Sequence, residues 1–190
     1  MAHDTPSPAP DGDADCESRF DQWTSDHMVV LYKVAYRLLG DAHDAEDVLQ
    51  ETFRSAWTSR HLYEPSRSER AWLLGILKRR AADHWRRHGR SPAALGDESA
   101  RLVAPPGPEP LADELSARMQ RALATLSVEL RETLLLVVVG ELTHQEAADL
   151  QGIPLGTVLS RVSRARAQVR ERLVANPESR AIGAPAAGRG

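Results

Sequence analysis

Five arginines lie within residues 152–173, GIPLGTVLSRVSRARAQVRERL, where the only acidic residue is Glu171. A helical wheel at 100° per residue predicts a buried face, spanning about 80°, that contains Val158, Val162, Ala165, Val169 and Leu173. The opposite face carries Ser160, Ser163, Arg164 and Ala167. Arginine and serine can hydrogen-bond base edges in the DNA major groove, and Thr157 lies near a helix N-terminus, where backbone donors favour phosphate. The segment therefore predicts a helix that lies against DNA.

A second helix, immediately before this one, completes a recognisable unit. Residues 143–150, THQEAADL, place Glu146 three positions after Thr143, which is the spacing of a capping box. The sequence QGI then predicts a tight turn, with Pro154 as the first residue of the next helix. Helix, short turn and helix predict a helix-turn-helix, a unit that repressors, response regulators and recombinases also contain. The alternative is a solvated, arginine-rich helix of a bundle.

Residues 41–57, DAHDAEDVLQETFRSAW, predict a different kind of surface. Asp47, Gln50, Glu51 and Arg54 share the helix face opposite an apolar stripe. Acid so close to the basic segment at 67–90 is better suited to a protein partner than to DNA. The alternative is that Asp44 caps the helix, that Asp47 completes a capping box, and that the other charges are solvated.

These segments belong to a chain whose apolar residues recur with helical rather than strand periodicity. We expect an all-α fold of two small helical domains joined by a flexible Pro/Gly-rich linker, the second ending in the helix-turn-helix. The expected divisions are a disordered acidic tail at 1–18, a first domain at 19–88, the linker at 89–111, a second domain at 112–174 and a disordered tail at 175–190.

Composition excludes several classes of protein. The formal net charge is −3, so local rather than total charge must identify partners. Cys16 is the sole cysteine, which excludes a disulfide within the chain and fits a cytoplasmic location. The longest apolar run, 134–139, is too short to span a bilayer, so we expect no membrane insertion. We expect no metal, no cofactor and no catalytic residue, because a phosphate-binding glycine loop and a credible nucleophile and base are missing; His43 and its acidic neighbours fit a helix cap better than a metal site.

Three motifs together resemble one known family. They are DAEDVLQETFRSAW at 44–57, RAWLLGILKRRAADHWRR at 70–87 and LSVELRETLLLVVVGELTHQEAADLQGIPLGTVLSRVSRAR at 126–166. In order and spacing they resemble conserved regions 2 and 4 of the extracytoplasmic-function (ECF) RNA polymerase sigma factors of the sigma-70 family. The resemblance runs from Phe20 to Leu173, so it implies that the first domain is region 2 and the second is region 4.

The resemblance also implies partners: the clamp helices of the largest subunit of core RNA polymerase and the flap of the second, promoter DNA, and an anti-sigma factor. It assigns core polymerase binding to Asp44, Glu46, Asp47, Gln50 and Glu51. It assigns the −10 element to Arg67, Arg70, Lys78, Arg79, Arg80, Arg86 and Arg87. It assigns the −35 element to Thr157, Ser160, Arg161, Ser163 and Arg164, with the two serines and Arg164 toward the bases.

Two positions depart from the family pattern. Arg79 stands where an asparagine is frequent, and Leu159 stands where a basic residue is common, so the resemblance implies no particular promoter sequence. The alternative function is a helix-turn-helix transcription regulator that binds DNA without polymerase. A recombinase ending in a helix-turn-helix is a weaker alternative, since the sequence offers no catalytic residues for it.

Overall fold

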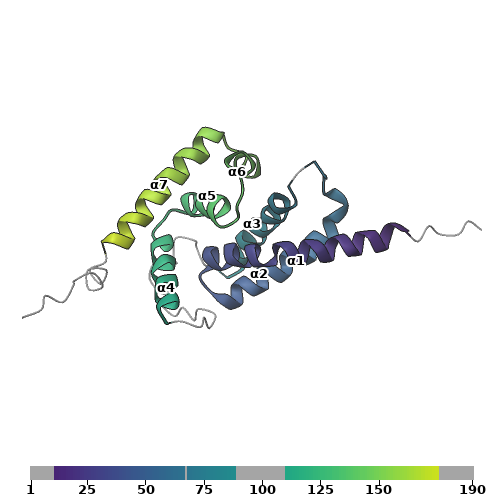
Figure 1. Cartoon of the computed structure of the whole chain (residues 1–190), viewed down its shortest axis with the longest axis horizontal. Helices are drawn as coiled ribbons and strands as arrows, with labels where there is room; N and C mark the ends of the chain where they lie inside the picture. Colours follow the sequence, from purple (N-terminus) through teal and green to yellow (C-terminus); the bar gives the residue numbers. More distant parts are fainter. Residues whose placement is uncertain (1–10, 67, 89–109, 176–190) are drawn as a thin grey trace, which may run out of the picture.

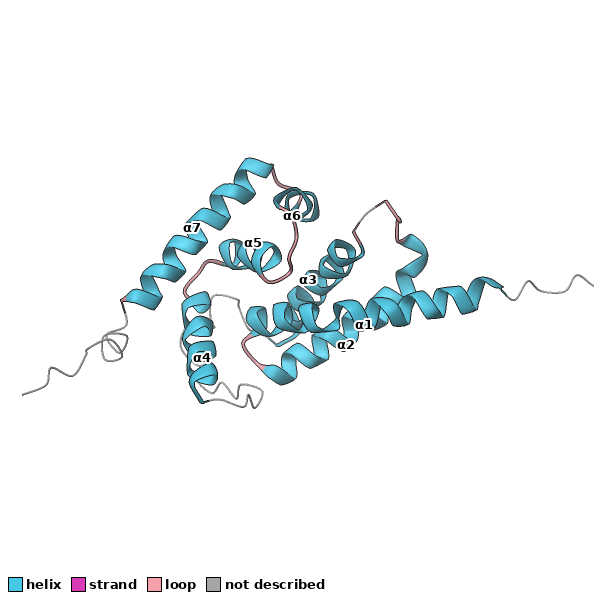
Figure 2. Cartoon of the chain, viewed as in Figure 1, coloured by secondary structure: helices cyan, strands magenta, loops and turns pink. Residues whose placement is uncertain are grey.

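The computed structural model describes residues 11–66, 68–88 and 110–175. This part of the chain folds into helices only, with no strand, which confirms the predicted all-α class (Figures 1 and 2). The helices are α1 (Asp11–Leu39), α2 (Ala42–Ser59), the 3₁₀ helix η1 (Arg60–Leu62), α3 (Glu69–His88), α4 (Pro110–Ala124), α5 (Val128–Val138), α6 (His144–Gln151) and α7 (Leu155–Val174). None of the described helices has both the length and the apolar character that crossing a membrane requires.

Helices α1, α2 and α3 pack on one another around a common apolar core. Leu31, Val48 and Leu73 come from the three helices, and each is at most 2% exposed. An aromatic cluster extends this core: the ring of Trp23 lies 4.9 Å from that of Tyr63 and 5.3 Å from that of Trp72. The cluster holds the loop before α3 against α1, so it positions the start of the basic helix.

Helices α4 to α7 form a second group, in which α7 packs on α4, α5 and α6. The predicted inward stripe of α7 is buried at Val158, Val162, Ala165 and Val169. Arg131 of α5 is only 2% exposed, and its guanidinium donates to the carbonyls of Ala124 and Leu126 just past the end of α4. Burial lowers the pKa of Arg131, but hydrogen bonds to carbonyl oxygens favour its charged form.

The helix-turn-helix of α6 and α7 has the predicted local chemistry. The Thr143 hydroxyl accepts from the backbone N–H of Glu146, and the Glu146 carboxylate accepts from the backbone N–H of Thr143. Gly152 ends α6 with φ of 65°, in the left-handed region that glycine enters without steric cost. Pro154 is the N-cap of α7 rather than its first residue, because its extended ψ of 145° places it just outside the helix.

The two groups also touch each other, because α5 packs against α1 and α6 packs against α3 (Figure 1). The Arg37 guanidinium of α1 donates to the Ser116 carbonyl at 3.1 Å and to the Gln120 side-chain oxygen at 3.2 Å. The Gln120 amide in turn donates to the Arg37 carbonyl. An ion pair of 3.1 Å joins Lys78 of α3 to Glu132 of α5.

The helix bounds revise the predicted ends of the two domains. Helix α1 begins at Asp11, so residues 11–18 are helical rather than part of a disordered tail. Once a helix is anchored by packing, adding residues at its end costs little, which lets a weakly apolar segment extend it. Helix α4 begins at Pro110, two residues inside the predicted linker. Residues 1–10, 89–109 and 176–190, which hold the rest of the predicted tails and linker, lie outside the described residues, and the domain limits stay predictions.

Candidate polymerase and DNA interfaces

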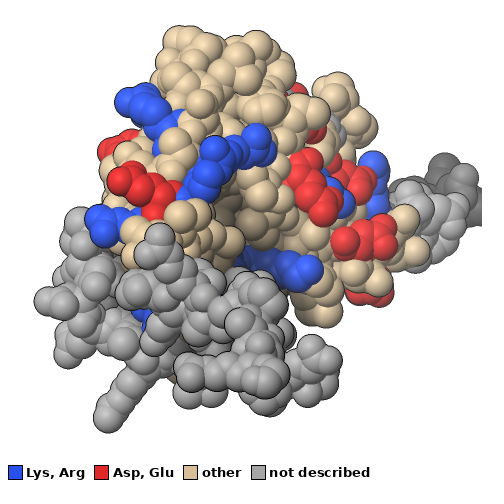
Figure 3. All heavy atoms as spheres, turned by 60° about the vertical axis from the view of Figure 1, so that its left-hand side comes forward, with Lys and Arg blue, Asp and Glu red and all other residues tan. Residues whose placement is uncertain are grey.

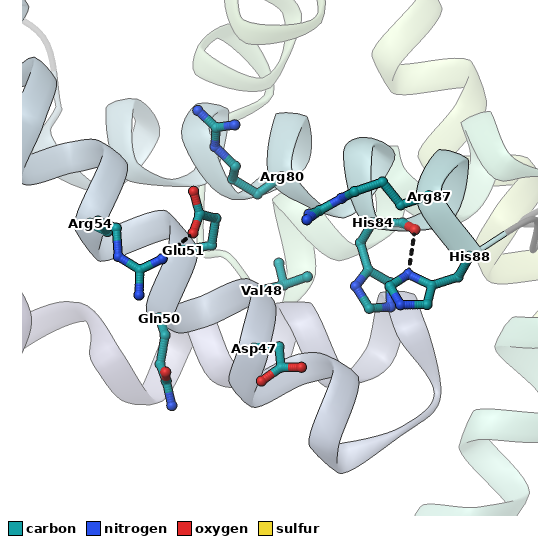
Figure 4. Close-up of a pocket in the computed structure, with 9 residues that line it drawn as sticks. All are labelled: Asp47, Val48, Gln50, Glu51, Arg54, Arg80, His84, Arg87 and His88. Atoms are coloured by element: carbon teal, nitrogen blue, oxygen red, sulfur yellow. Dashed lines mark hydrogen bonds and ion pairs between the residues drawn. The ribbon is translucent and has the colours of Figure 1, made fainter.

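Helix α2 presents an exposed polar face that includes three of the predicted polymerase contacts. Its N-cap is Asp41, whose carboxylate accepts from the backbone N–H groups of His43 and Asp44. Asp47, Gln50 and Glu51 follow on the outer side of the helix and are drawn together in Figure 4. Asp47 and Gln50 are exposed, whereas Glu51 is half-buried. The structure therefore brings two carboxylates and an amide to one accessible surface.

Asp44 has a different environment from the other acidic residues of α2. The alternative in which Asp44 caps the helix is wrong, because Asp41, one turn earlier, fills that position. The Asp44 carboxylate instead lies 3.3 Å from Nε2 of His84 on α3, and the two side chains are only 17% and 5% exposed. Asp44 thus joins α2 to α3 and offers little surface to a partner.

Glu46 is exposed on α2 but is not part of the surface around Asp47. It lies toward α1: burial raises the pKa of Tyr32, and the negative charges of Glu46 and Asp41 raise it further. The five predicted contacts on α2 therefore divide into three that lie together, one beside α1 and one that is largely covered.

A recess of about 230 Å³ separates the exposed face of α2 from α3, and sequence reasoning did not predict it. Arg80, His84, Arg87 and His88 of α3 line it opposite Asp47 and Glu51 (Figure 4). The His84 and His88 rings stack with centroids 4.1 Å apart. The i, i+4 spacing of these histidines indicates that they share one face of α3. That this face lies against α2 depends on packing between helices and has no signal in the sequence.

The basic residues of α3 that are predicted to contact DNA have varied surroundings. Arg79, Arg86 and Arg87 are exposed. Arg80 and Arg86 both pair with Asp83 on the same helix. Arg67 lies outside the described residues. The face of α3 is therefore cationic but partly neutralised by its own aspartate.

Two further basic residues of α3 point toward the second helical group. Lys78 pairs with Glu132, and Arg70 pairs with Glu141 just before α6. Neither glutamate could be identified as a partner from sequence, since each lies more than 50 residues away. Both side chains thus form ion pairs with carboxylates of the same chain.

Helix α7 presents most of its predicted DNA-contacting residues outward. Ser160, Ser163 and Arg164 are exposed. The Ser160 hydroxyl donates to the Thr157 carbonyl at 2.9 Å, and Arg164 Nε donates to the Ser160 carbonyl at 3.3 Å. The Arg164 side chain thus lies along the helix with the rest of its guanidinium available.

Thr157 and Arg161 lie closer to the body of the second group, and both are half-buried. The pKa of Glu129 on α5 is lowered by hydrogen bonds from its own backbone N–H and from Ser127, and the nearby Arg161 guanidinium lowers it further, while burial opposes the shift. Arg161 therefore lies at the edge of the outward face, beside α5.

Charges of both signs share the described surface. In Figure 3, Lys and Arg extend from the left to the centre of the view, the largest group of Asp and Glu lies at the right with basic residues among it, and a smaller acidic group lies at the left. No group of three or more His, Cys, Asp or Glu side chains among the described residues is arranged to hold a metal ion.

Comparison with known proteins identifies this combination of helices. The Sigma-70 region 2 profile matches residues 24–91, and the Sigma-70 region 4 profile matches residues 116–169. The chain is 34% identical to the RNA polymerase sigma factor CnrH of Cupriavidus metallidurans over 84% of this chain and 88% of that protein. The chain belongs to the ECF RNA polymerase sigma factors of the sigma-70 family.

Other relatives and solved structures agree with this membership. The ECF RNA polymerase sigma factor SigE of Mycolicibacterium smegmatis is 37% identical over 85% of this chain, and the match spans 64% of SigE. The structure of CnrH in complex with the cytosolic domain of CnrY has a TM-score of 0.65 at 27% identity and covers 86% of this chain and 95% of CnrH. The sigma factor RpoE of Bartonella quintana, solved with the anti-sigma factor NepR, has a TM-score of 0.65 at 26% identity. This match covers 82% of this chain and 99% of RpoE. These two solved sigma factors thus share this chain's helical arrangement.

Proposed function

We propose that this ECF sigma factor binds core RNA polymerase through the outer face of α2 and directs promoter-specific initiation by contacting the −10 element with α3 and the −35 element with α7. The observation that best supports this assignment is the separation of an acidic, amide-bearing helix face from a serine- and arginine-bearing one. A protein that only binds DNA gains nothing from the first face, because exposed carboxylates repel phosphate.

In the polymerase contact, Asp47, Gln50 and Glu51 are the residues that touch core enzyme, and Glu46 contributes at the margin. Asp44 acts through its contact with His84, which fixes α2 against α3. Asp44 is therefore a positioning residue in this proposal. Its loss should act by loosening α2 rather than by removing a contact to polymerase.

In the −10 contact, the exposed Arg79, Arg86 and Arg87 meet DNA first, and Arg67 and Arg80 join them. Arg70 and Lys78 can do so only after phosphate replaces Glu141 and Glu132 as their partners. Phosphate is a suitable replacement, since DNA offers one negative charge about every 1.7 Å along its axis. The contacts of Arg70 and Lys78 with DNA thus require the two helical groups to separate at these pairs.

In the −35 contact, α7 lies in the major groove with Ser160, Ser163 and Arg164 toward the bases. An exposed arginine next to two serines suits bidentate recognition of guanine with adaptable hydroxyl bonds on either side. Thr157 and Arg161, at the edge of this face, meet the backbone. The capped α6 and the Gly152 turn hold α7 at a fixed angle for this purpose.

The proposal extends to regulation and to the cellular compartment. The solved relatives CnrH and RpoE are bound to CnrY and to the anti-sigma factor NepR. We infer that an anti-sigma factor also binds this chain, and that it works in the cytoplasm, where core polymerase transcribes. It acts as an initiation factor and not as an enzyme.

The experiment that tests the proposal is a footprint on a promoter selected from a random library. The chain with core polymerase should protect both elements, whereas the chain alone should protect neither. Protection of a site by the chain alone at the same concentration and salt would favour the alternative, a regulator that binds DNA independently.

A further inference from the structure

A recess on the outer side of α7 has apolar side chains among its lining residues. One of them is Leu159, which is 49% exposed. The recess has a volume of about 350 Å³, and Val162 and Ala167 also line it. Removing apolar surface from water is favourable, so an exposed leucine leaves apolar surface that a partner can cover.

Basic side chains line the same recess. Arg166 and Arg170 of α7 and His144 at the start of α6 are among its lining residues. Arginines beside apolar side chains suit a partner that presents both phosphates and an apolar group. An ordinary apolar protein segment would leave these cations without partners.

The recess is continuous with the face that the proposed function assigns to base recognition. Leu159, Ser163 and Ala167 follow at i, i+4 and i+8, so they form one row along the helix. Ser163 belongs both to that row and to the proposed −35 contacts. A duplex that reaches Ser163 therefore also covers Leu159.

Hydrogen bonding cannot be the role of Leu159, because its side chain has neither donor nor acceptor. The C5-methyl group of thymine is the apolar group that a base pair presents in the major groove. Resting on this proposed −35 role of α7, we propose that Leu159 receives a thymine methyl group, and so selects a thymine at one position of the −35 element. Leu159 is then a specificity-determining residue.

The test replaces thymine by deoxyuridine, which removes the methyl group and leaves every hydrogen-bonding atom in place. Holoenzyme reconstituted from core polymerase and the full chain transcribes promoters in which each −35 thymine, on either strand, is replaced in turn. At one position the replacement should lower output about fourfold, the loss expected for one buried methyl-sized group. This measurement needs no protein variant.

A matched pair of variants locates the effect on the protein. With Leu159→Ala, thymine and deoxyuridine at that position should give output within about 1.5-fold of each other. Leu155→Ala is the control, because Leu155 is 41% exposed on the same helix but does not line the recess. It should preserve the fourfold difference.

The outcomes separate this inference from the proposed function beneath it. If output does not depend on the −35 sequence at all, the proposed role of α7 is wrong, and this inference with it. If the −35 sequence matters but deoxyuridine has no effect at any position, the −35 role stands and the thymine proposal is overturned. A fourfold thymine effect that persists in Leu159→Ala would also overturn it, since another residue must then receive the methyl group.

Discussion

Replacing Asp47 with lysine should weaken binding to core polymerase while leaving the fold nearly unchanged. The Asp47 side chain is 56% exposed, and its ion-pair partner His43, 3.9 Å away, is 83% exposed. Exposed pairs of this kind contribute about 0.2–1 kcal/mol at most, so the free energy of unfolding should change by less than about 1 kcal/mol. For a domain of this size that corresponds to a shift in Tm below about 8 °C.

The effect of this change on polymerase binding should be larger. A like charge placed against a complementary surface costs more than the loss of an exposed pair, and close charge pairs at interfaces have coupling energies of about 1.5 kcal/mol or more. We therefore expect Asp47→Lys to raise the Kd for core polymerase at least about tenfold, measured by fluorescence anisotropy of the labelled chain. Added salt should reduce the difference.

Asp26→Lys is the matched control, since Asp26 is exposed on α1, away from the proposed contact. It makes the same change in net charge and should leave the Kd within about twofold of the unaltered chain. If Asp47→Lys and Asp26→Lys bind core polymerase equally well, total charge rather than the α2 face governs capture, and the reasoning is refuted.

Glu51 is less suitable for the same substitution. Unlike Asp47, Glu51 is half-buried, and its carboxylate lies 2.6 Å from Nη1 of Arg54. A lysine there would break this close ion pair and place two cations together, which should lower stability as well as binding. Loss of polymerase binding in Glu51→Lys would therefore not by itself identify a contact.

Three other predictions concern the helix-turn-helix group. Thr143→Ala removes the α6 cap and should destabilise the domain by about 1 kcal/mol, seen as a lower Tm. Burial raises the pKa of Glu146, but hydrogen bonds from Thr143 and Ser68 and the nearby Arg70 guanidinium together hold it below 4.5. The part of this stability difference that depends on the Glu146 carboxylate should therefore be full above pH 4.5 and shrink as the pH falls through the lowered pKa. Gly140→Ala should lower the free energy of unfolding, measured in urea, by about 1–3 kcal/mol, because a Cβ there would lie 2.6 Å from a backbone oxygen. The control is Gly156→Ala, which should not destabilise the domain because a Cβ at Gly156 has nothing within 4 Å. Arg164→Ala should lower transcription about 5- to 150-fold for one −35 base and relax the preference there, and a uniform loss across a −35 library would contradict base recognition.

Local chemistry explains which parts of the fold the sequence could predict. The Thr143–Glu146 capping box, the Gly152 turn and the inward stripe of α7 depend on residues within a few positions of one another. The sequence left open whether Asp44 caps α2, because Asp41 and Asp44 both suit an N-cap, and only the structure identifies Asp41 as the cap.

Contacts between distant helices explain most of what the sequence could not predict. Asp44 pairs with His84, 40 positions along the chain, so its burial has no local signal. Lys78 and Arg70 were expected on an open DNA-binding face, yet each lies against a glutamate of the other helical group. The sequence thus predicts which residues have suitable chemistry for a binding site. Tertiary packing decides which of their side chains a partner can reach.

The most direct test of the account is a transcription assay with purified components. A linear template that carries a promoter selected by the holoenzyme is incubated with core polymerase alone, with the chain alone and with both. The account predicts one defined transcript, which starts just downstream of the −10 element and forms only when both are present. The same transcript from core polymerase alone, or none from the combination when a reference sigma factor activates the same core preparation, would contradict the claim that this chain directs promoter-specific initiation.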